Sequence, residues 1–276
     1  RTLDMLGKMA ANEPEKYATF WSQFGAVLKE GPSEDHANRD KIAKLFRFAS
    51  SSVEGAVPGV SLADYIARMK EGQDKIYYVT GDSYSVINNS PYLEVFRKHG
   101  IEVLLMSDRV DEWMMGYLTE FDGKSFQDVA RGELDLSSIT GHASDSDPDD
   151  KDSKTDNDQH KEVITRISTL LEDRVQEVRV TGRLTDSPAC LVVGDNDMGE
   201  QMRKIMEAAG QAVPESKPIL EVNMEHPLVS KLSAESNEDA AARLAGVLFD
   251  QAALSAGRPL ENPAKFVQEL NKLMFG

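Results

Sequence analysis

Residues 75–106, KIYYVTGDSYSVINNSPYLEVFRKHGIEVLLM, contain two strand-like segments with a helix-like segment between them. Residues 75–79 are β-branched and aromatic, and residues 101–106 are almost continuously apolar, which is typical of a strand buried on both faces of a parallel sheet. The intervening residues 90–100 carry Pro91 in their first turn and end on a glycine, which favours a helix. The stretch therefore predicts a βαβ unit.

A helical segment precedes this unit. Residues 1–72 are expected to be mainly helical. Residues 14–31 carry apolar and aromatic side chains at helical spacing, and residues 40–50 continue that pattern. Ser61 is expected to cap a short helix, with Asp64 at the capping-box position. We therefore expect the first domain to begin with packed helices.

The βαβ unit is expected to form a small three-layer α/β subdomain over residues 73–130. A helix capped by Ser107 or Asp108 is predicted within residues 107–123. Residues 124–129 favour an edge strand after the turn at Gly123.

The composition changes after residue 130. Residues 141–152 contain no large apolar side chain and cannot bury a face, so residues 131–159 are predicted to be an acidic linker or a solvated helix extension. This segment separates a first domain, residues 1–130, from a second, residues 160–276. A chain of 276 residues has room for about two domains.

The second domain is expected to be of the α+β class, following the α/β class of the first. Strands are predicted at residues 175–180, 190–193 and 219–223. The chain then ends in two amphipathic helices, which favour packing against a partner chain. The expected dimer contacts are Leu244, Leu248, Ala252, Phe266, Leu270, Leu273 and Met274.

The charge balance limits the possible partners. The chain has 47 acidic and 31 basic residues and a net charge of −16, which disfavours nucleic acid and anionic membrane surfaces. No apolar run reaches the ~18 residues that a membrane span needs.

The single cysteine, Cys190, lies in an apolar segment and is expected to be a buried thiol in a reducing compartment. The chain opens in a helical pattern without an initiator methionine, which favours a piece of a longer protein.

The sequence predicts no catalytic residue and no metal ligand. The turn at residues 80–83 lacks the glycine spacing of a dinucleotide fingerprint and the lysine of a phosphate loop. No two histidines stand at metal-ligand spacing on one expected element. Asp111 and Glu112 could act as an acid/base pair, but charges on a helix surface are usually solvated.

Two apolar groups favour binding over catalysis. Trp113 lies beside two methionines and Tyr117, and methionine adapts to varied partners. Alternatively, Met114, Tyr117 and Leu118 face the core. A second stripe consists of Met198, Met202, Ile205, Met206 and Ala209 on one predicted helix, and it could either pack in a core or remain exposed as a contact for apolar chains.

Several long motifs resemble the heat-shock protein 90 chaperone family in its bacterial form. They occur in the order and spacing of that family at residues 20–25, 45–50, 69–78, 107–123 and 183–189. The resemblance covers nearly the whole chain, and the acidic residues 138–158 match least. It implies the later part of a middle domain followed by a C-terminal dimerisation domain.

The resemblance also implies where the cofactors bind. The family holds ATP and Mg²⁺ in a separate N-terminal domain, whose motifs have no counterpart in this sequence. The parent protein is therefore expected to be an ATPase, whereas this chain is expected to bind no cofactor and to hydrolyse no ATP.

The family resemblance also implies binding residues and partners for this chain. The resemblance implies a homodimer joined by a four-helix bundle, partly folded client proteins, cooperation with the heat-shock protein 70 system and a cytoplasmic location. The implied client contacts are Trp113, Met114, Gly116, Tyr117, Met198, Met202, Ile205 and Met206.

Two other functions remain open from the sequence. The chain could be a dimerisation or scaffold module whose methionine stripe is buried, which the exposure of Met198, Met202 and Met206 would test. It could also be an α/β nucleotide-binding enzyme, which a nucleotide titration would test.

Overall fold

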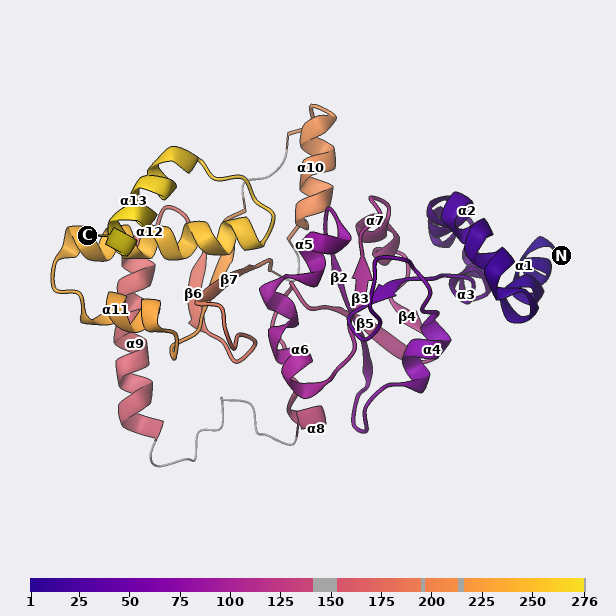
Figure 1. Cartoon of the computed structure of the whole chain (residues 1–276), viewed down its shortest axis with the longest axis horizontal. Coiled ribbons are helices and arrows are strands. Elements are labelled where there is room, and N and C mark those ends of the chain that lie inside the picture. The colour runs from indigo at the N-terminus through magenta and orange to yellow at the C-terminus, as the bar shows by residue number, and fades with distance from the viewer. Residues whose placement is uncertain (141–152, 195–196, 213–215, 276) are drawn as a thin grey trace. The chain divides into compact units, whose positions relative to one another are not determined.

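The computed structural model describes residues 1–140, 153–194, 197–212 and 216–275 (Figure 1). The chain forms two compact units, each with its own hydrophobic core. The first unit comprises Arg1–Asn89, Phe96–Val129 and Gly199–Gln211, and the second comprises Ser90–Val95, Ala130–Met198 and Ala212–Gly276. Helices and a small sheet occur in both units, which confirms the predicted mixed α/β composition.

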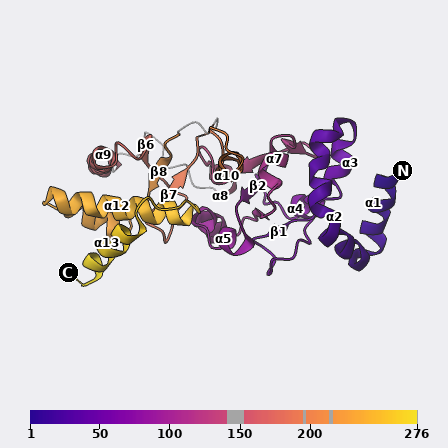
Figure 2. The ribbon, with the colours of Figure 1, turned by 90° about the horizontal axis from the view of Figure 1, so that it is seen from above.

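Three helices open the first unit: α1 (Thr2–Asn12), α2 (Pro14–Glu34) and α3 (Arg39–Ala43). α2 packs against both α1 and α3 (Figure 2). Tyr17 and Trp21 of α2 are buried, and the Tyr17 hydroxyl donates a hydrogen bond to the Leu45 carbonyl. The helix expected over residues 40–50 ends early, because Ala49–Ser50 pair with the first sheet as strand β1.

The first sheet confirms the predicted βαβ unit. Its strands lie in the order β1-β3-β2-β5-β4. The further strands are β2 (Lys75–Thr80), β3 (Leu104–Met106), β4 (Glu120–Phe121) and β5 (Lys124–Asp128). β2 runs parallel to β3 and to β5, and β3 is buried throughout. Between β2 and β3 lie α5 (Tyr84–Asn88), the 3₁₀ turn η2 (Pro91–Leu93) and α6 (Glu94–His99).

The predicted edge strand is wrong in its position. β5 lies between β2 and β4, so β4 forms the edge. The reason is a hairpin between β4 and β5, whose turn residues Asp122 and Gly123 both have positive φ, 49° and 73°. Asp-Gly is a preferred pair for such a turn. The hairpin also ends the helix predicted over residues 107–123, of which only Asp111–Met115 form the helix α7.

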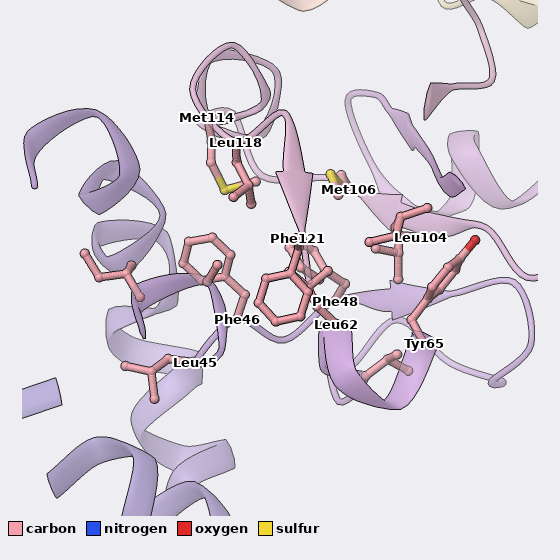
Figure 3. Packing of buried hydrophobic residues seen from close by; sticks show 14 of the residues in the cluster. Leu45, Phe46, Phe48, Leu62, Tyr65, Leu104, Met106, Met114, Leu118 and Phe121 are labelled. Atoms are coloured by element: carbon pink, nitrogen blue, oxygen red, sulfur yellow. The ribbon is translucent and has the colours of Figure 1, made fainter. Parts of the chain in front are cut away.

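Alternate residues of β2 pack on opposite sides of the sheet, as the period of a strand requires. Ile76 belongs to the main core of the first unit, whereas the Tyr77 ring packs edge-on against Phe96 at 4.9 Å. Figure 3 shows the main core, in which residues from the helices and strands meet around Phe46 and Phe48. The helix α4 (Leu62–Ala67) closes this core and begins with the predicted capping box of Ser61 and Asp64.

The second unit is built on a three-stranded sheet in the order β6-β8-β7. Its elements are α8 (Ser137–Thr140), α9 (Ser153–Leu170), β6 (Glu177–Val180), β7 (Ala189–Val192), β8 (Ile219–Val222), α11 (Pro227–Ala234), α12 (Glu238–Ser255) and α13 (Pro263–Phe275). Val178, Leu220 and Leu191 lie in register across the three strands. They share one core with Ile167 of α9 and Leu248 of α12.

The next row of this sheet is polar. Arg179, Glu221 and Cys190 lie in register across the strands and, by the alternation of side chains, on the face opposite the core. Cys190 is buried, as the sequence predicted, and burial raises the pKa of its thiol. The polar row therefore lies in the interior of the second unit.

The predicted acidic linker is only partly covered by the structure. α8 and the start of α9 fall within residues 131–159. Residues 141–152 of this segment lie outside the described residues. Of the helices described, none has both the length and the apolar composition needed to cross a bilayer.

Glu94 belongs to the second unit and binds a loop of the same unit. Its carboxylate accepts hydrogen bonds from the backbone N–H groups of Thr185, Asp186 and Ser187, at 2.6–3.2 Å, and from the Ser187 hydroxyl at 2.5 Å. Burial raises the pKa of Glu94, but the hydrogen bonds together outweigh burial and lower it below its ordinary value. The ionised carboxylate therefore stabilises the folded unit.

Replacing Glu94 by alanine should lower the free energy of unfolding of the second unit by about 1–2 kcal/mol at neutral pH, since the carboxylate is partly exposed. A lowered pKa in the folded state means that this contribution is present above pH ~4.3, the ordinary value, and is lost as the pH falls through the folded pKa. Urea unfolding of the chain and of Glu94→Ala at pH 7 and below pH 4 measures the difference. Glu162→Ala, on the exposed side of α9, is the matched control and should change little. A loss of unfolding free energy that is the same at both pH values would contradict the role of the Glu94 charge.

Candidate binding surface

The helix α7 (Asp111–Met115) carries Trp113 and is a single turn that begins differently from the prediction. Its N-cap residue is Val110, whose side chain cannot accept a hydrogen bond. Neither Ser107 nor Asp108 takes the predicted N-cap position. Instead, the Asp111 carboxylate accepts a hydrogen bond from the Asp108 backbone N–H at 2.9 Å, which closes the turn before the helix.

A buried lysine holds this turn in place. The Lys29 ammonium of α2 lies 2.7 Å from Asp108 Oδ2 and 2.7 Å from Asp111 Oδ1. The Phe48 ring lies 4.9 Å from the same ammonium. Burial raises the pKa of Asp111, and the Lys29 charge opposes that increase. Asp111 is thus a buried structural anion, whereas the sequence favoured a solvated charge.

One side of α7 faces the core. Met114 and Leu118 are fully buried, and Figure 3 shows both directed towards the cluster around Phe46. Met114 was expected to touch clients, but in this structure its side chain fills the core, as the alternative interpretation of the sequence had it. Any contact of Met114 with a client would require α7 to move.

The other side of α7 is open. Trp113 is half-buried, Tyr117 is 37% exposed, and their rings lie 5.0 Å apart. Gly116 is exposed at the end of the helix, and a Cβ added there would meet the Trp113 carbonyl oxygen at 3.2 Å. The Arg39 guanidinium donates a hydrogen bond to the Tyr117 carbonyl. Trp113, Gly116 and Tyr117 therefore form a surface with two aromatic rings.

The methionine helix, α10 (Glu200–Ala208), belongs to the same unit and contacts α7. Met202 and Met206 are half-buried and Ile205 is 44% exposed. Met198 precedes the helix, is half-buried and belongs to the second unit. Since 44% of Ile205 is exposed, the stripe is not wholly a core face.

Two charged contacts hold α10 on the first unit. Glu112 Oε2 of α7 accepts a hydrogen bond from the Met202 backbone N–H at 3.0 Å. The Lys204 ammonium lies 2.6 Å from Asp82 Oδ2, after β2. Local sequence patterns could not reveal either contact, because each joins residues far apart in the chain.

The predicted dimer contacts divide into two sets. Leu244, Leu248 and Ala252 of α12 are buried in the core of the second unit itself. Along α13, no residue is buried: Phe266, Leu270 and Leu273 are half-buried and Met274 is 64% exposed. Phe275, which was not among the predicted contacts, is 81% exposed. The apolar surface available to another chain therefore lies on α13.

Among the described residues, no group of three or more His, Cys, Asp and Glu side chains is arranged to hold a metal ion. Cys190, the one cysteine of the sequence, is buried with a raised thiol pKa, so it is poorly suited to act as a nucleophile. The features that stand out are apolar surfaces suited to binding other proteins.

Aromatic and methionine side chains that stay exposed beside a well-packed core are typical of proteins that bind other polypeptides. Residues 1–275 match the family model described as Hsp90 protein, so the chain belongs to the Hsp90 family of ATP-dependent chaperones. The family resemblance seen in the sequence motifs is thereby confirmed.

Proposed function

We propose that this chain is the later middle domain and C-terminal dimerisation domain of a bacterial, HtpG-type member of the family. In this proposal it dimerises and holds partly folded client proteins on the surface formed by Trp113, Tyr117 and the α10 stripe. The observation that carries the proposal is the half-exposed Trp113–Tyr117 ring pair beside Met202 and the exposed Ile205.

The chemistry of this surface suits clients without a fixed sequence. Tryptophan and tyrosine provide large contact areas, and methionine adapts its shape to different apolar groups. Burying one large apolar side chain gives about 1.5–3 kcal/mol, so each contact is weak alone. Two copies in a dimer would bind one extended client more tightly than either copy alone.

The exposed face of α13 supports the dimer. Val267, Met274 and Phe275 are each more than half exposed, and their helix follows α12, which packs in the core. A second copy of the chain that covered this face would remove their apolar surface from water. The four-helix bundle implied by the resemblance, with two helices from each chain, is the arrangement that we propose.

Further parts of the proposal concern the parent protein. We propose that ATP and Mg²⁺ bind its N-terminal domain and that this chain hydrolyses no ATP. We also propose a cytoplasmic location and cooperation with the heat-shock protein 70 system. The alternative of a pure scaffold module needs a buried stripe. Met198, Met202 and Met206 are half-buried and Ile205 is exposed, which favours an accessible stripe.

Replacing Trp113 by serine together with Met202 by glutamine should weaken client binding by tenfold or more, about the loss of one buried large side chain. Fluorescence anisotropy with labelled, reduced and alkylated α-lactalbumin, a permanently unfolded chain, measures the affinity. The matched controls are Val57→Ser and Met5→Gln, which replace exposed apolar residues elsewhere in the first unit.

The same samples test the dimer by sedimentation. The chain and all variants should be dimers at micromolar concentration, since α13 is unchanged. A monomeric chain would contradict the proposed dimer. An equal loss of affinity in the control variants would contradict the proposed client surface.

A further inference from the structure

The helix α10 lacks a cap of its own. Its N-cap residue is Gly199, which has no side chain to accept a hydrogen bond from the first turn. The first N–H groups of a helix need such acceptors and carry partial positive charge. In this structure Glu112 supplies a carboxylate oxygen 3.0 Å from the Met202 N–H, in the first turn of α10. A residue of α7 thus performs the capping role.

The position of Glu112 links this cap to the binding surface. Glu112 directly precedes Trp113 in a helix of a single turn, and the two helices are packed together. The second contact, between Lys204 and Asp82, joins two partly exposed side chains and is expected to contribute less. Of the contacts described, the hydrogen bond from the Met202 N–H to Glu112 is the one that joins α7 itself to the first turn of α10.

We propose that Glu112 is a positioning residue that caps α10 and so assembles Trp113 and Met202 into one composite client surface within a single chain. The inference rests on the proposed function and adds to it the contact that brings the two apolar groups together. Without the cap, α10 leaves α7 part of the time. The apparent affinity for clients then falls in proportion to the fraction of molecules in which the surface is still assembled.

The first readout is amide hydrogen exchange of α10, which needs no client. Replacing Glu112 by alanine should speed exchange at residues 202–208 by about two- to thirtyfold, the effect of losing one helix cap. Glu207→Gln is the matched control, because Glu207 pairs with Arg203 inside α10 and does not touch α7 in any described contact. Unchanged exchange in Glu112→Ala would overturn the capping role, whatever the function of the chain.

The second readout separates helix formation from docking. Gly199 has φ −70° and ψ 164°, a backbone conformation that is also open to serine, so Gly199→Ser offers α10 a cap that does not involve α7. The double variant Glu112→Ala, Gly199→Ser should recover slow exchange in α10 but keep the lowered affinity for reduced and alkylated α-lactalbumin. Recovery of full affinity would overturn the positioning role. If the unaltered chain fails to bind this probe, the proposed function falls, whereas the exchange result still tests the cap.

Discussion

Replacing Lys29 by methionine should lower the free energy of unfolding of the first unit by about 3–5 kcal/mol, the usual cost of removing one partner of a buried ion pair. Lys29 is buried and its ammonium lies 2.7 Å from carboxylate oxygens of both Asp108 and Asp111. Asp111 is completely buried, so the variant leaves an ionised carboxylate without its cation. Urea unfolding followed by circular dichroism measures the loss.

The loss should depend on pH, and its sign follows from Asp111. Burial raises the pKa of this carboxyl, and removing the Lys29 ammonium removes the charge that opposes the increase. A pKa raised in the folded state means that the cost is absent below pH ~3.9, the ordinary value, and grows as the pH rises to the folded pKa. The difference between Lys29→Met and the unaltered chain should therefore be largest near neutral pH and shrink towards pH 4.

Two further variants make the prediction specific. Lys29→Met with Asp111→Asn should recover much of the lost stability, because no buried charge remains and asparagine can still accept the Asp108 N–H. Lys16→Met is the matched control: its partner Glu13 lies 3.0 Å away and both side chains are more than half exposed, so the change should stay within about 0.5 kcal/mol. If Lys29→Met behaves like Lys16→Met, or if Asp111→Asn adds to the loss, the buried pair does not stabilise the fold.

Lys29 also shows where sequence reasoning reached its limit. Periodicity places Tyr17 and Trp21 on the buried face of α2 and predicts the βαβ unit, because these depend on nearby residues. Lys29 lies on the same buried face, but its partners stand far along the chain. A charge at a core position indicates that a partner exists without identifying it.

The same limit applies to the binding surface. Trp113 and the methionine stripe could be selected from the sequence, because both are unusual groups of apolar residues at helical spacing. Which side of α7 is open depends on the hairpin that follows it, and this hairpin was missed although Asp122-Gly123 is a strong turn signal. The docking of α10 beside α7 within one unit depends on Glu112 and could not have been predicted locally.

Glu221 gives the second large effect. Replacing it by glutamine should lower the free energy of unfolding of the second unit by about 3–5 kcal/mol, because the buried Arg183 cation would lose its ion pair with Glu221. The Arg183 Nε lies 2.6 Å from Glu221 Oε2, and Arg179 Nη2 lies 2.7 Å from Oε1. The Thr181 hydroxyl donates to the same carboxylate at 2.7 Å. Glutamine preserves the shape of the side chain, but it replaces one acceptor oxygen by an NH2 donor, so the loss combines the charge with the hydrogen bonds of that oxygen.

Cys190 makes this effect measurable at the site itself. It is the single cysteine of the chain, it is buried, and its sulfur lies 3.9 Å from Glu221 Oε2. A thiol reagent reaches it only when the polar row opens, so its labelling rate reports the free energy of opening. A loss of about 3–5 kcal/mol should raise the rate of labelling by a hundredfold or more, at 1.4 kcal/mol for each factor of ten.

Glu238→Gln is the matched control for this experiment. Glu238 pairs with Arg166 at 2.8 Å in the same unit, but its side chain is 74% exposed, so both stability and labelling should stay close to those of the unaltered chain. Comparable labelling rates in Glu221→Gln and Glu238→Gln would show that the buried row is held by packing alone. A hundredfold difference would instead show that the buried Glu221 carboxylate, with the arginines that it binds, keeps Cys190 closed inside the second unit, because the two variants make the same substitution at a buried and at an exposed ion pair.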